Sequence, residues 1–157
     1  MNDRPAVPPN APVRAGLLRR LAAMLYDVLL LVGVLMVATA LFLPLTGGEA
    51  VFSGRNPVLE WVYRAALLAL IVGFFGVFWT IRGQTLGMAS WRLRVEREDG
   101  ALLGWGDAVR RLGWALVSLL PLGLGFLWIL LDPGRRAWHD RLSGTRVVVL
   151  PKGSKSP

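Results

Sequence analysis

The sequence contains no cysteine and only one histidine, His139. Without cysteine, a disulfide framework, thiol catalysis and thiolate metal sites are all excluded. One histidine cannot by itself build an imidazole metal site or a recognisable Ser–His hydrolase. We therefore expect no enzymatic activity, no metal and no cofactor.

Acidic residues are also scarce, since 10 Asp and Glu oppose 18 Lys and Arg and leave a net charge of +8 at pH 7. Such a basic balance is common in nucleic-acid-binding proteins. Here, however, the basic residues flank long uncharged runs, where charge sets membrane topology and meets anionic lipid. We expect a bilayer with anionic headgroups as partner, and no nucleic acid.

Long apolar runs dominate what is present: 54% of the residues are hydrophobic and the mean hydropathy is +0.51. The run Leu21–Leu43 is long enough to cross a hydrocarbon core of about 30 Å, and a second run has its uncharged part at Ala65–Ile81. A third, Leu112–Leu131, is interrupted at Pro121–Gly125, which breaks or kinks a helix. These runs predict an all-α membrane protein with two full transmembrane helices and a third segment that is kinked or re-entrant.

The chain is short enough for one domain. Residues 1–13 are rich in proline and predict a disordered N-terminal tail, and residues 151–157 predict a disordered C-terminal tail. The membrane domain is then residues 14–150.

Lys and Arg are distributed unevenly along the chain. Four lie at or before Arg20, one lies in the first loop, six lie from Arg82 to Arg111, and six follow Asp132. The positive-inside rule predicts a multi-pass protein of the cell membrane with a cytoplasmic N-terminus and middle loop. A straight third span would export the six charges of the tail.

Two strand-like runs, Leu93–Arg97 and Thr145–Leu150, bear on the same question. A lone strand leaves its backbone groups unpaired, so these two runs are natural partners, and pairing requires that they lie on one side of the membrane. We favour a re-entrant or strongly kinked third segment with a small cytoplasmic β element. A straight third span with an external tail stays open, because twenty residues can also cross.

Asp27 is the most informative residue, because it is the one charge inside the first span. A charge at this depth costs several kcal/mol unless it is paired, wetted or neutralised. Arg20 lies about 10 Å away along the helix axis, so we expect a partner from another segment: Arg82, Arg110 or Arg111. Protonation is the alternative. Both a proton or cation site and a structural ion pair remain open.

Small residues recur along the second span at Ala69, Gly73, Gly76 and Thr80. This stripe would let another helix approach closely, although a chain rich in Gly and Ala also produces such spacing by chance. A homo-oligomer or a complex with a partner membrane protein is consistent with it.

Four groups of residues together resemble the RDD family of small bacterial membrane proteins, which is named for one arginine and two aspartates. They are Arg20-x-x-Ala23-x-x-x-Asp27, then Gly83-Gln84-Thr85-Leu86-Gly87, then Arg110-Arg111, and finally Asp132 with His139-Asp140-x-x-x-Gly144-Thr145. The resemblance covers about Arg14 to Leu150. It implies that Arg20, Asp27 and Asp140 are the named residues, with Asp132 as a weaker match for the second aspartate. The family commonly has Lys where this chain has Met88.

Two enzymatic interpretations are set aside. Tyr26-Asp27 and Gly104-Trp105-Gly106-Asp107 imitate an intramembrane aspartyl protease, but Asp107 is explained as an N-cap of a helix starting at Ala108. Asp132 and His139-Asp140 could form a metal or acid–base cluster, but we favour a structural network with neighbouring arginines.

Two hypotheses for function remain. In the first, the protein is a transporter-like module in which Asp27 binds a proton or a monovalent cation, and Arg20 and Asp140 gate or neutralise it. In the second, it is a membrane assembly or interaction module, in which the same charges lock helices together and the basic loops bind lipid or a partner. Arg111 and Asp132 belong to this charge network in both hypotheses.

Overall fold

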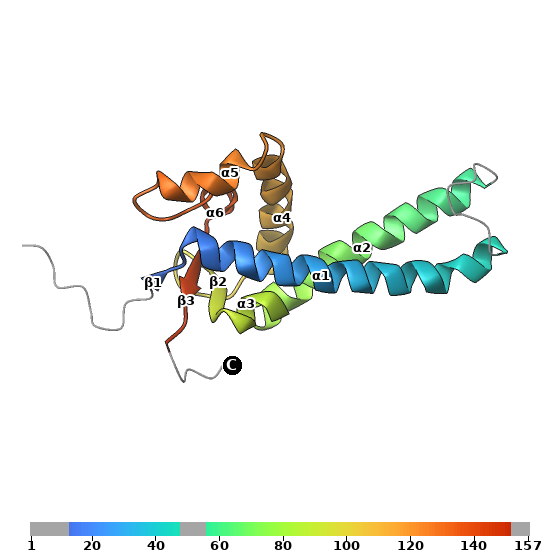
Figure 1. Cartoon of the computed structure of the whole chain (residues 1–157), viewed down its shortest axis with the longest axis horizontal. Coiled ribbons are helices and arrows are strands. Elements are labelled where there is room, and N and C mark those ends of the chain that lie inside the picture. Colours follow the sequence, from blue (N-terminus) through green and yellow to red (C-terminus); the bar gives the residue numbers. More distant parts are fainter. Residues whose placement is uncertain (1–12, 48–55, 152–157) are drawn as a thin grey trace, which may run out of the picture.

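The computed structural model describes residues 13–47 and 56–151. The predicted disordered tails therefore lie outside the described residues, except for Val13 and Pro151. Figure 1 shows a long two-helix projection that emerges from a smaller unit of short helices and strands.

The two predicted spans are present. Helix α1 covers Leu17–Phe42 and continues into a 3-10 turn, η1, at Leu43–Thr46, while helix α2 covers Pro57–Ile81. With 26 residues, α1 is about 39 Å long, so it is longer than a hydrocarbon core. The two helices are joined near their outer ends, where the Thr39 and Tyr63 hydroxyl oxygens lie 2.8 Å apart.

The start of α2 follows from its local sequence. Pro57 stands at the first turn, where its missing N–H costs nothing. The side chain of Asn56 caps the helix by accepting a hydrogen bond from the Leu59 backbone at 3.1 Å. Glu60 and Arg64, four positions apart on α2, form an ion pair at 3.6 Å.

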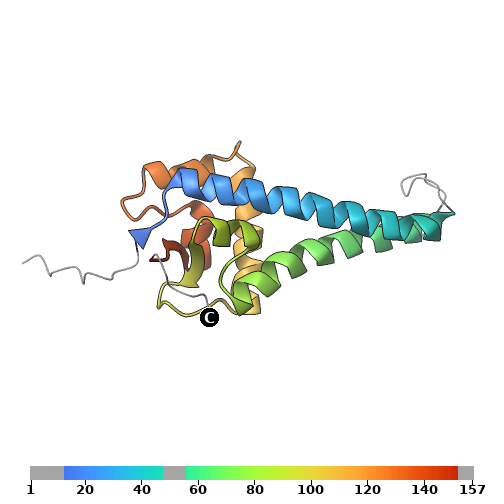
Figure 2. The ribbon, with the colours of Figure 1, turned by 60° about the horizontal axis from the view of Figure 1, so that its bottom comes forward.

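The third apolar segment is sharply bent. Helix α4, Trp105–Leu119, is followed by α5, Leu124–Leu127, and the 3-10 turn η2, Trp128–Leu130, with an angle of 106° at the break. Gly123 has a φ of +79° at the bend, a conformation that favours glycine. In both views α4 lies across the direction of α1, not along it (Figures 1 and 2). The predicted interruption is therefore real.

Close packing holds this bend in place. A Cβ atom on Gly125 would come within 2.6 Å of the Cβ of Ser118, so only glycine lets α5 fold back onto α4. At the other end of α4, the N-cap is Gly104 and not Asp107. Asp107 lies at the third helical position, where its carboxylate accepts a hydrogen bond from the Gly104 backbone at 3.1 Å.

A small antiparallel sheet joins the two strand-like runs. Strand β2, Leu93–Arg97, pairs with β3, Thr145–Val149, in a register that places Leu93 opposite Val149. Strand β1, Val13–Arg14, adds to the other edge of β3, so the order is β1-β3-β2. The pairing brings the chain after η2 back beside the middle loop, as predicted for a segment that turns back. Strand β1 was not predicted.

The buried core lies where α1 meets this sheet and two short helices, α3 (Leu86–Ser90) and α6 (Trp138–Ser143). Figure 2 shows α3 and the sheet lying beneath the N-terminal part of α1. Core side chains include Ala23, Met88, Leu93, Val95, Ala108 and Val147. Because the outer halves of α1 and α2 project away, their apolar side chains remain exposed to the surroundings.

Candidate functional site: two buried aspartates beside one cavity

The first buried carboxylate, Asp140 on α6, lies between two arginines. Its Oδ2 atom accepts hydrogen bonds from Nη1 of Arg20 and, at 3.1 Å, from the Ala137 backbone. Its Oδ1 atom lies 2.7 Å from Nη1 of Arg111. The Asp140 side chain has no exposed surface, so three elements (α1, α4 and α6) meet at one carboxylate.

The two arginines extend the network further. Nε of Arg20 donates to the Ala15 carbonyl at 3.2 Å, and its Nη2 donates to the Arg135 carbonyl at 3.0 Å. Nη1 of Arg111 also donates to the hydroxyl of Thr145, at the start of β3. Every donor-bearing nitrogen of Arg20 is therefore used, which is what a buried guanidinium requires.

Burial and the neighbouring charges together set the pKa values of Asp140 and His139. Burial alone would raise the pKa of Asp140, but the guanidiniums of Arg111 and Arg20 outweigh it and hold the pKa well below its usual range. For His139, burial and then the charge of Arg111 lower the pKa to about 3. At pH 7 the cluster thus holds two cations, one anion and a neutral imidazole.

The second buried carboxylate, Asp27, has no cation beside it. The hydroxyl of Thr85 donates to its Oδ2 at 2.5 Å, and the backbone N–H of Gly87 donates to its Oδ1 at 2.9 Å. No ion pair to Asp27 forms in residues 13–47 and 56–151. The expected partnership with Arg82, Arg110 or Arg111 is therefore wrong, because a hydroxyl and an amide take the place of a charge.

The Gly83–Gly87 segment is built for this contact. Thr85 caps α3 by accepting a hydrogen bond from the Met88 backbone at 3.2 Å, and it donates to Asp27 with the same hydroxyl. A Cβ on Gly87 would overlap the backbone oxygen of Ala23 and come within 2.8 Å of Oδ1 of Asp27. Glycine at this position therefore lets α3 approach α1 closely enough to bind the carboxylate.

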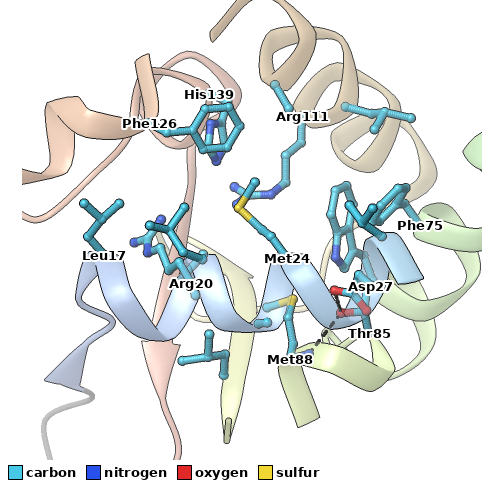
Figure 3. Close-up of a pocket in the computed structure, with 18 of the residues that line it drawn as sticks. Leu17, Arg20, Met24, Asp27, Phe75, Thr85, Met88, Arg111, Phe126 and His139 are labelled. Carbon is cyan, nitrogen blue, oxygen red and sulfur yellow. Dashed lines mark hydrogen bonds between the residues drawn. The ribbon is translucent and has the colours of Figure 1, made fainter. Parts of the chain in front are cut away.

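A cavity of about 170 Å³ separates the two aspartates. Asp27 lines one side of it, while Arg20, Arg111 and His139 line another. Figure 3 shows Arg111 and His139 across the cavity from Asp27 and Thr85, with Met24 between them. The predicted residues Arg20, Asp27 and Arg111 thus meet at one space, and Asp140 lies directly behind it.

Two other predicted features lie elsewhere. Asp132 follows η2, where it accepts a hydrogen bond from the Arg136 backbone at 2.9 Å and lies 3.7 Å from Arg141. That backbone hydrogen bond, followed by the nearby arginines, lowers the pKa of Asp132. It belongs to the turn between η2 and α6, with a side chain that is only 6% exposed, and it does not line the cavity.

Of the small-residue stripe on α2, Gly76 alone makes a close helix contact among the described residues. A Cβ there would overlap the ring of Trp105 on α4, whereas Gly73 has open space around it. Thr80 donates to the Gly76 carbonyl of its own helix at 2.8 Å, and Ala69 is exposed.

Sequence reasoning about charges missed Thr85, Gly87 and Thr145 as contact residues. Each stands in one of the short motifs that carried the family resemblance, so the signal was present but its chemistry was not apparent. The structure also adds Trp79, whose ring lies 5.4 Å from Cζ of Arg111 and lines the cavity.

The contact between Arg20 and Asp140 joins two of the residues on which the family resemblance rests. A family model supports that resemblance independently. The model of the RDD family matches residues 14–144. The chain belongs to the RDD family. No curated protein and no solved structure matches it.

Within this RDD protein, the residues assigned to the family name take different parts. Arg20 and Asp140 bind each other, although they are 120 positions apart in the chain. Asp27 stands alone on the far side of the cavity. Met88, where the family commonly has Lys, is buried in the core, so this chain has no cation there to approach Asp27. In the described part of the chain, no group of three or more His, Asp and Glu is placed to hold a metal ion.

Proposed function

We propose that this RDD protein is a transporter-like membrane module in which Asp27 binds and releases a proton or a monovalent cation. One observation carries the proposal: the Asp27 carboxylate is buried on a membrane-spanning helix, lines a cavity and has no cationic partner in the described chain. A carboxylate in that position is stabilised by a proton or by a small cation.

The two hydrogen bonds to Asp27 support this role, because they fix the carboxylate without neutralising it. Thr85 and Gly87 hold its oxygens on the α3 side. The Arg20–Asp140–Arg111 network would act as the fixed end of the cavity, with two cations around one carboxylate. Its second arginine keeps the local charge balanced when Asp27 is ionised.

One copy of the chain is too small to enclose a path. None of the most apolar 18-residue stretch of the first span is buried within the chain, and only 11% of that of the second span is. We therefore place at least two copies in the working assembly. The uneven distribution of Lys and Arg supports a cytoplasmic N-terminus in the cell membrane.

The test is ion flux in proteoliposomes loaded with a pH-sensitive dye and pulsed with Na⁺, K⁺ or Li⁺. Wild type would give a cation-dependent pH change, and Asp27→Asn would abolish it while the protein still inserts. Asp99→Asn is the matched control, because Asp99 is an exposed carboxylate away from the cavity, with an ion pair to Arg97 at 3.7 Å and a hydrogen bond from the Ala101 backbone at 3.0 Å. Flat traces from folded wild-type protein would contradict the proposal.

A second candidate is a non-catalytic assembly module, and the doubly paired Asp140 favours it. Both oxygens of that carboxylate face arginines from other elements, so Asp140 locks the fold and has no free oxygen for acid–base chemistry. In this case the basic loops bind lipid or a partner membrane protein. Asp27→Asn would then impair assembly, and wild type would show no flux.

A further inference from the structure

The residues that line the cavity carry polar atoms that the protein itself does not satisfy. Arg111 uses only Nη1 in its hydrogen bonds, and its Nε and Nη2 bind no other group in residues 13–47 and 56–151. Nε1 of Trp79 and Nδ1 of His139 also lack a partner. Both side chains are more than nine-tenths buried, at 7% and 5% exposure.

Unsatisfied buried polar atoms are rare in folded proteins and call for a specific explanation. Here they belong to residues that line the same cavity. Arg111 and Trp79 lie together, with the guanidinium 5.4 Å from the ring centre. A guanidinium with free N–H groups and an indole N–H form a set of donors suited to an oxygen-rich anion.

Apart from Arg20, Asp27 and Thr85, the rest of the wall is apolar. On α1 the lining runs from Leu17 to Val28, a stretch of about 16 Å along the axis. The opposite wall includes Leu112 and Ala115 of α4 and Phe126 of α5. Helices α1 and α4 thus both line this space, while the main packing partners of the two helices are α3 and α6.

We propose that this cavity binds one anionic phospholipid, with its phosphate on the free N–H groups of Arg111 and an acyl chain along the apolar wall of α1. Arg111 and Arg20, which lies in the first turn of α1, bind the same carboxylate, and basic residues at the end of a span lie at the level of the lipid headgroups. One anionic phospholipid has both a phosphate that these donors can bind and an acyl chain that can lie along the apolar wall.

Ionised Asp27 has the same sign of charge as the phosphate, but its oxygens bind the hydroxyl of Thr85 and the amide of Gly87 on the α3 side and not the donors of Arg111. Figure 3 shows it on the side of the cavity away from Arg111 and His139. The lipid site goes beyond the proposed function and does not depend on it, since binding can be measured without any flux.

The test is native mass spectrometry of the detergent-solubilised protein with phosphatidylglycerol or phosphatidylcholine. Wild type should retain one phosphatidylglycerol in preference to phosphatidylcholine. Ala115→Phe fills the cavity and should reduce this retention about tenfold. Leu116→Phe is the matched control, because Leu116 is a neighbouring residue on α4 that is 62% exposed, and it should retain the lipid as wild type does.

Two further experiments distinguish a phospholipid headgroup from a free anion. Arg111→Lys keeps the charge but loses the planar fork, and it should lower the preference for the anionic lipid while circular dichroism stays unchanged. Oleate and inorganic phosphate, added separately, should displace the lipid only weakly. If Ala115→Phe fails to fold, Ala115→Leu fills part of the same space.

Equal retention of the two lipids by wild type would overturn the proposal, as would undiminished retention by a folded cavity-filling variant. Displacement by oleate or phosphate at the concentration of the lipid would also overturn it, because the site would then take a free anion. Loss of lipid with intact flux would leave the role of Asp27 standing.

Discussion

Asp27 and Asp140 are both buried carboxylates beside the same cavity, but their partners differ in kind. Asp140 is surrounded by charges: two guanidiniums share its oxygens. Asp27 is held by dipoles: one hydroxyl and one backbone amide. Opposite charges fix a carboxylate in its ionised form, whereas dipoles hold its position and still let it exchange a proton or cation. Asp140 is therefore a structural aspartate, whereas Asp27 is the candidate for binding a proton or a cation.

The largest effect should come from Asp140→Asn, which leaves two arginines buried without their counter-charge. Removing one member of a buried ion pair costs about 3–5 kcal/mol, and we expect the free energy of unfolding to fall by that amount. Thermal or denaturant unfolding in detergent, followed by circular dichroism, would measure it. Asp99→Asn is the control, and an equal effect of the two substitutions would refute the structural role.

Low pH should destabilise the same network, because His139 must bind a proton when the protein unfolds. The pKa of His139 is near its ordinary value of 6.5 in the unfolded chain, whereas burial and the charge of Arg111 lower the pKa to about 3 in the folded protein. Stability should therefore fall as the pH drops below 6.5, by about 3 kcal/mol at pH 4.

Asp140 does not add to the slope in this window. Its stabilisation is present above the unfolded pKa of about 3.9 and is lost only as pH falls through the lower folded value. His139→Phe, which keeps a ring against Phe126 at 4.7 Å, should flatten the pH dependence measured by unfolding. A slope unchanged in that variant would show that another group is responsible.

On the Asp27 side, Gly87→Ala should destabilise by about 1–3 kcal/mol, because the added methyl overlaps Ala23 and crowds the carboxylate. Gly106→Ala is the matched control: it lies in α4 with open space around it and should be neutral or slightly stabilising. Thermal unfolding compares the two. A neutral Gly87→Ala would mean that α3 does not need its close approach to α1.

The smallest effect on stability should come from Asp27→Asn, at about 1 kcal/mol, because the substitution disturbs hydrogen bonds but strands no charge. The same variant should lose flux completely. A loss of stability as large as that of Asp140→Asn would erase the difference between the two aspartates and favour the assembly module.

Much of the fold could be predicted, because membrane spans and backbone pairing follow simple rules. The length of the uncharged runs identified the two spans, and the segment Pro121–Gly125 identified the bend. The need to pair backbone groups indicated that Leu93–Arg97 pairs with the last strand. Strand β1 could not be found, since Val13–Arg14 is too short to show alternation.

The candidate site was harder to predict. The expectation for Asp27 considered only charged partners, and the actual partners, a threonine hydroxyl and a glycine amide, leave no charge signal in a sequence. The contact between Arg20 and Asp140 spans 120 positions, and distance along one helix says nothing about it. The family resemblance pointed to these residues but not to their geometry.

The order of the sheet has a consequence for how the protein is made. Strand β3 lies between β1 and β2, and Asp140 precedes it by only a few residues, so the last part of the membrane domain to be synthesised completes both the sheet and the ion pairs. Until it emerges, Arg20 and Arg111 have no counter-charge and β1 has no neighbour. A chain that stops after the bend therefore keeps both long helices but lacks the counter-charge of Arg20 and Arg111 and the central strand of the sheet.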